Sequence, residues 1–172
     1  KKIFWHGVND LKTNPKVFSK IGDCQSRPNV FLGIYDMGYE GILADEDLYL
    51  QAAIDYYKGS FLMESYAVHD GMNVGSVLTT TWADPKACYK DENALECEIR
   101  IHNPSMMFVN LGTNWVSGVS TDAYYDYLAE IVQVLIDHGI LPILSSKADN
   151  VEGDNSINRI TAQVARDFDV PF

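Results

Sequence analysis

The hydrophobic positions of this chain predict strands and helices that alternate. The clearest helix covers residues 122–138, because apolar residues recur there at helical spacing and Gly139 supplies the left-handed residue that often ends a helix. Short apolar runs at 106–111 and 140–145 flank this helix and are typical of buried strands. A strand, a helix and a second strand in this order predict a parallel crossover unit.

The same alternation continues toward both ends of the chain. Residues 17–22 and 60–68 are predicted strands, and 45–58 is a predicted helix whose acidic first turn suits the helix dipole. Residues 155–168 have the pattern of an amphipathic helix, and 170–172 reads as the start of a final strand. The sequence therefore predicts an α/β fold, with a mostly parallel sheet inside a three-layer α/β/α sandwich.

Length and composition fit one globular domain. The chain has 172 residues, of which 47% are hydrophobic and 22% are charged. No apolar run is long enough to span a membrane, and the first residues lack the apolar stretch of a signal peptide. We expect a single domain over residues 1–172 that is incomplete at both ends, since the chain lacks an initial Met and stops where a strand should continue.

The charge balance disfavours nucleic acid as a partner. Thirteen Lys and Arg residues stand against 24 Asp and Glu residues, giving a net charge of −11, and the basic residues are scattered. An acidic surface repels a phosphate backbone. The glycine patterns that cradle nucleotide phosphates are also missing, which disfavours a flavodoxin-like nucleotide binder, and no cofactor is expected.

The three cysteines, Cys24, Cys88 and Cys97, predict one disulfide. Their spacing does not fit a structural metal site, so no bound metal is expected. Cys88 and Cys97 bracket a short polar stretch, where a bridge would contribute roughly 2–3 kcal/mol. A disulfide indicates an oxidising compartment, so we expect an extracellular or periplasmic protein. Cys24 is then left unpaired, which makes it a candidate for reactivity.

Polar segments follow each predicted strand. They cover residues 22–26, 69–76, 112–115 and 146–150, and they are rich in small residues, amides and hydroxyls. In open parallel sheets, binding sites form at the carboxyl ends of the strands. We therefore expect the site at this edge.

Three of these segments resemble the sequence blocks of the GDSL/SGNH hydrolases. Gly22-Asp23-Cys24 resembles block I, the segment from Gly71 to Gly75 resembles block II, and Gly112-Thr113-Asn114 resembles block III. The resemblance covers most of the chain from about Val17 onward. It implies the flavodoxin-like fold of that family.

The resemblance also implies hydrolysis of small acyl esters, including O-acetyl esters of carbohydrates. Cys24 stands where the family has its serine nucleophile. The implied oxyanion hole consists of the Cys24 N–H, the N–H of Gly71 or Gly75, and the Asn114 side chain. Such donors stabilise the negative oxygen of the tetrahedral intermediate.

The chain departs from the family pattern at three points. Cys24 replaces serine, Trp115 stands where the family often has Asp, and the Asp-x-x-His that supplies the base is expected beyond Phe172. Ser26 is an alternative hydroxyl and His69 an alternative base. A catalytically impaired relative that keeps the pocket as a ligand- or carbohydrate-binding module is the alternative function.

Overall fold

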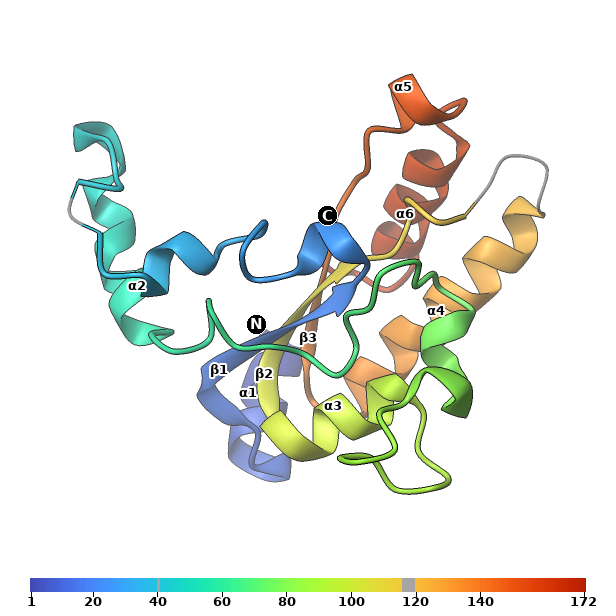
Figure 1. The fold of residues 1–172 in the computed structure, drawn as a ribbon, viewed down its shortest axis with the longest axis horizontal. Coiled ribbons are helices and arrows are strands. Elements are labelled where there is room, and N and C mark those ends of the chain that lie inside the picture. Colours follow the sequence, from blue (N-terminus) through green and yellow to red (C-terminus); the bar gives the residue numbers. More distant parts are fainter. Residues whose placement is uncertain (40, 116–119) are drawn as a thin grey trace.

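A three-stranded parallel sheet lies at the centre of the structure (Figure 1). The computed structural model describes residues 1–39, 41–115 and 120–172. Within these ranges the strand order is β1-β2-β3. The strands are β1 (Asn14–Gly22), β2 (Pro104–Asn110) and β3 (Leu141–Leu144).

Helices surround this sheet. The α-helices are α1 (Lys2–His6), α2 (Gln51–Tyr56), α3 (Ala94–His102), α4 (Thr121–Asp137), α5 (Asp149–Glu152) and α6 (Ser156–Asp167). A π-helix covers Gly7–Leu11, and short 3₁₀-helices cover Cys24–Ser26, Gly33–Asp36, Asp45–Leu50, Ser76–Leu78 and Thr80–Trp82. None of the helices in the described ranges has the length and apolar character needed to cross a membrane.

The predicted crossover unit is confirmed, because α4 connects β2 to β3 and the two strands pair in parallel. One face of the sheet joins the main core, in which Met107 and Val109 of β2 lie with Leu128 and Ile131 of α4. The opposite face is aromatic: Phe108 of β2 contacts rings of Phe18 and Phe31. The α/β class predicted from the alternating pattern is therefore correct.

The predicted strand at 60–68 does not form; only Val68 makes an isolated bridge with Gly22. Serine side chains instead form hydrogen bonds with backbone groups on the outer edge of β1. The Ser60 hydroxyl accepts the Phe18 N–H at 3.3 Å, and the Ser65 hydroxyl donates to the Lys20 carbonyl at 2.7 Å. These serines occupy the backbone groups of β1 that a neighbouring strand would use.

Two other predicted elements differ in detail. The helix expected at 45–58 is a 3₁₀-helix over Asp45–Leu50 followed by α2, and it ends before Gly59. The final strand expected at 170–172 is not assigned, although the Leu144 N–H donates to the Pro171 carbonyl at 2.9 Å. Helix α3 was not predicted, because it begins inside the polar stretch of sequence between Cys88 and Cys97.

A buried carboxylate on α3 joins three segments. Glu98 is fully buried and accepts hydrogen bonds from the Ser19 hydroxyl of β1, the Tyr66 N–H at 2.7 Å and His102 Nδ1 at 2.7 Å. A buried charge is tolerated only when its partners are all in place. Glu98 therefore fixes α3 against β1 and against the segment that leads to residues 69–76.

We predict that Glu98→Ala lowers the free energy of unfolding by about 3–5 kcal/mol, because it leaves buried donors without an acceptor. Urea unfolding followed by circular dichroism measures this change. Glu130→Ala, which removes an exposed carboxylate from α4, is the control and should stay within about 0.5 kcal/mol of the parent chain. Equal effects of the two substitutions would contradict the role given to Glu98.

Candidate active site

The first segment of the candidate site is a tight turn at the end of β1. Asp23 caps the 3₁₀-helix Cys24–Ser26, since its Oδ1 accepts the Gln25 N–H at 2.8 Å. A Cβ at Gly22 would collide with the Ser26 side chain, so this position requires glycine. The turn leaves the thiol-bearing residue Cys24 exposed.

Ser26 does not fit the alternative role of nucleophile. Its side chain is buried against Gly22, and its hydroxyl has no hydrogen-bond partner among the residues that the structure describes. A substrate cannot reach a hydroxyl in this position. Within this turn, the exposed nucleophile is therefore the Cys24 thiol.

Asn114 brings the three predicted segments together. Its Nδ2 donates to Asp23 Oδ2 at 3.1 Å and to the Met72 carbonyl at 3.1 Å. Asp23 precedes Cys24, and Met72 lies between Gly71 and Gly75, so one amide links all three segments. Because an amide group has two hydrogens, both donors of Asn114 are already used.

The two glycines of the second segment differ in their N–H groups. The Gly75 N–H donates to Asn73 Oδ1 at 3.0 Å. The Gly71 N–H has no acceptor in the described part of the chain, and Gly71 has a φ of +85° that favours glycine. Of the two N–H groups, the one of Gly71 is free to bind a ligand.

An ion pair makes a second link between the first two segments. Arg27 Nε lies 2.8 Å from Asp70 Oδ1. The hydrogen bond from Arg27 lowers the pKa of Asp70 and raises the pKa of Arg27. Sequence reasoning missed this pair, as it missed the bond between Asp23 and Asn114, because both join residues far apart in the chain.

The described residues supply no base at the thiol. In those ranges, the hydrogen-bond partner of Cys24 Sγ is Gln25 Nε2 at 3.8 Å, and an amide cannot accept a proton. His69, the alternative base, directs Nε2 to the Tyr66 carbonyl at 3.1 Å, and its ring contacts Trp82. His69 is thus engaged away from Cys24.

Trp115 packs its ring against aromatic side chains of α4. Its ring centroid lies 5.7 Å from that of Tyr124 and 6.1 Å from that of Tyr127. The ring of Tyr127 also covers Gly75, where an added Cβ would lie 3.3 Å from Tyr127 Cε2. An aromatic wall therefore stands beside the segment 71–75.

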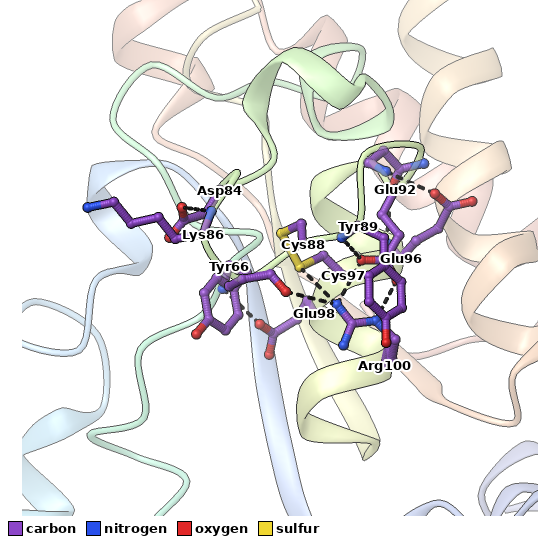
Figure 2. Close-up of a disulfide and its surroundings, with 12 residues drawn as sticks. Tyr66, Asp84, Lys86, Cys88, Tyr89, Glu92, Glu96, Cys97, Glu98 and Arg100 are labelled. Carbon is purple, nitrogen blue, oxygen red and sulfur yellow. Dashed lines mark hydrogen bonds and ion pairs between the residues drawn. A yellow bond between two sulfur atoms is a disulfide. The ribbon is translucent and has the colours of Figure 1, made fainter.

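The predicted disulfide is present. Cys88 and Cys97 are bonded, with their Cα atoms 5.2 Å apart. Figure 2 shows Arg100 beside this bridge, with Nη2 2.8 Å from Glu92 Oε2 and with the ring of Tyr89 against the guanidinium. Glu92 and the two sulfurs are the one group of three potential metal ligands in the described residues, and these atoms are already engaged.

Comparison with known proteins identifies the fold. No family model matches the sequence, and no curated protein matches it. Among solved structures, the chain is similar to the crystal structure of AlinE4, an SGNH-hydrolase family esterase, with a TM-score of 0.50 and 16% identity, over 92% of this chain and 75% of that one. A mutant of the same esterase matches with a TM-score of 0.50 and 17% identity, over the same shares.

The chain therefore has the fold of the SGNH hydrolases, as the sequence blocks implied. At this level of identity, the similarity concerns the fold alone.

We predict one reactive thiol per chain, that of Cys24, with Ellman's reagent in the absence of reductant. The count should stay the same after unfolding in urea, because the other two sulfurs are bonded. Prior reduction should raise it to all three cysteines, and Cys24→Ser should abolish it in the unreduced chain. Three thiols in the unreduced chain would contradict the disulfide.

We also predict that Asn114→Ala lowers the free energy of unfolding by about 1–3 kcal/mol, because the buried Asp23 carboxylate loses a donor. Urea unfolding measures the difference. Asn150→Ala, at an exposed position of the short helix α5, is the matched control and should have little effect. A similar loss in both variants would mean that Asn114 does not hold the three segments together.

Proposed function

We propose that the chain is an ester hydrolase of the SGNH type, with Cys24 as its nucleophile. The observation that carries this proposal is the Asn114 amide, which joins the three segments beside an exposed thiol. A nucleophile next to free N–H donors is the arrangement that acyl transfer needs.

In the proposed reaction, Cys24 Sγ attacks the acyl carbon of the ester. The carbonyl oxygen becomes an oxyanion, which accepts hydrogen bonds from the N–H groups of Cys24 and Gly71. The C–O bond then breaks, the alcohol leaves with a proton, and the acyl group stays on sulfur as a thioester. Water attacks the thioester, releases the carboxylic acid and restores the thiol.

Asn114 can bind an oxyanion only if one of its present hydrogen bonds breaks. Its two hydrogens already bind Asp23 and the Met72 carbonyl, so an oxyanion has to displace one of these acceptors. With no base at Cys24 Sγ in the described residues, deprotonation depends on solvent. Both features predict slow turnover.

The proposed substrates are small acyl esters, including O-acetyl groups on carbohydrates. Aromatic rings lie beside both glycines of the second segment, with Trp82 near Gly71 and Tyr127 near Gly75. Flat apolar walls around a few polar groups are typical of sites for small molecules. The disulfide supports an extracellular or periplasmic location for this activity.

A binding module without catalysis is the second candidate function. The occupied hydrogens of Asn114 and the unassisted thiol favour it, because a binding pocket needs neither a free amide nor a base. The same segments would then hold an acylated ligand without cleaving it.

The decisive measurement is turnover of p-nitrophenyl acetate. We expect slow steady release of nitrophenolate that Cys24→Ala abolishes. Imidazole, as an external base, should raise the Cys24-dependent rate about tenfold or more, since a positioned base contributes ~10²–10⁴-fold. The rate of the Cys24→Ala variant with imidazole is subtracted, because imidazole itself cleaves this ester.

Ser146→Ala is the matched control, since it removes an exposed hydroxyl from another loop at the same edge of the sheet. Its rate should equal that of the parent chain. A single burst of nitrophenolate without steady release would show that the thioester forms but is not hydrolysed. That result, or turnover that survives Cys24→Ala, would contradict the proposed hydrolase.

A further inference from the structure

Exposed apolar side chains concentrate in one lobe, which we define as residues 30–39 and 41–62. Nine of the fifteen large apolar residues that are exposed in the described ranges belong to it. Proteins rarely expose contiguous apolar patches unless they bind something there. The nine residues are Val30, Ile34, Met37, Tyr39, Leu48, Tyr49, Leu50, Tyr56 and Leu62.

The lobe is held at its base. One carboxylate, that of Asp36, accepts the N–H groups of Gly59, Phe61 and Leu62 at 2.8–3.0 Å. These hydrogen bonds join Asp36, in the first part of the lobe, to residues 59–62 at its end. Figure 1 shows that α2 lies away from the sheet. Neither α2 nor the preceding 3₁₀-helix buries a residue. The apolar side chains of these helices are therefore exposed, while the hydrogen bonds to Asp36 hold the base of the lobe together.

A groove of about 410 Å³ runs along the lobe. Its apolar lining includes Tyr39, Leu43, Leu48 and Ile54, and the charged residues Asp36, Asp55 and Lys58 also line it. This volume is enough for a few side chains of a partner.

The 3₁₀-helix Asp45–Leu50 combines acidic and apolar residues in a regular order. Three acids are followed directly by Leu48, Tyr49 and Leu50. In a 3₁₀-helix, residues three apart lie one above the other. Each side of this helix therefore carries one carboxylate stacked on one large apolar side chain.

The charge of the lobe indicates which kind of partner could bind to it. Five acids stand against one base, Lys58, in its described residues. A second copy of this chain carries a net charge of −11 and is repelled, as is an anionic membrane. A positively charged protein segment is attracted to the same surface.

We propose that the lobe is a docking surface for a cationic segment of a partner protein, in which apolar side chains alternate with Lys or Arg. The apolar residues enter the groove, and the basic residues pair with the carboxylates at positions 45–47. This proposal does not depend on Cys24 or on ester hydrolysis.

The probe is a short fluorescent amphipathic peptide of Leu and Lys, and its binding is followed by fluorescence anisotropy at about 0.15 M salt. We expect Leu48→Ser/Tyr49→Ser to weaken binding at least about tenfold, because both side chains lose their apolar contact. These residues are 57% and 75% exposed, so the variant should fold normally, which its thermal unfolding checks. Val151→Ser, at a residue 80% exposed on α5, should bind like the parent chain.

A second pair of variants tests the charges. Asp45→Asn/Asp47→Asn should weaken binding several-fold and flatten its dependence on salt. Asp126→Asn/Glu130→Gln removes the same charge from exposed positions of α4 and should leave affinity unchanged. A peptide with Glu in place of Lys should not bind.

Several outcomes would overturn the proposal. One is equal affinity of the parent chain and the Leu48→Ser/Tyr49→Ser variant. Another is a dimer in solution that this variant dissociates, since the occupant would then be a second copy. The third is binding to vesicles of anionic lipid that the same variant abolishes, which would make the lobe a membrane-binding surface.

Discussion

The buried carboxylate of Glu98 sets the geometry on which the rest of the structure depends. It takes donors from α3, from β1 and from the segment around Tyr66, three parts of the chain that share no local sequence. Removing any one of these donors leaves a buried carboxylate oxygen without a partner, which is costly in the interior. From Tyr66 the backbone reaches Val68, which bridges Gly22, so the second segment of the site is held next to the first.

Asp23 repeats this arrangement inside the candidate site. It is also fully buried, and its two oxygens accept from the Gln25 N–H and from the Asn114 amide. The same amide donor that organises the site is therefore unavailable to a ligand unless a bond is broken. The hydrogen bonds that join the three segments and the proposed contact with an oxyanion need the same hydrogens of Asn114, so the fold suits an enzyme and a binding module equally.

The parts of the fold that the sequence predicts are those with a local cause. Helix α4 and the strands on either side of it follow from periodicity within a single window of residues. The segment 60–68 has the composition of a strand, but Ser60 and Ser65 satisfy β1 through their side chains, and this depends on a distant partner. Helix α3 also has a local signal at its start, the capping box of Asn93 and Glu96. In the candidate site, the motifs predict Cys24 and Asn114 at the ends of their strands, whereas the bond from Asn114 to Asp23 joins residues 91 positions apart and has no local signal.

The lobe and the candidate site are parts of one excursion from the sheet. The chain leaves β1 through the turn at Cys24, forms the lobe, and returns along the edge of β1 before it reaches Gly71. Side chains hold the returning segment: Lys20 Nζ donates to the Phe61 carbonyl at 2.9 Å, and burial lowers the pKa of this lysine. No strand ladder joins residues 60–65 to β1, so side-chain hydrogen bonds rather than the sheet attach this segment. With this kind of attachment, the outer side chains of the lobe can be substituted while β1, β2 and the turn at Cys24 keep their register.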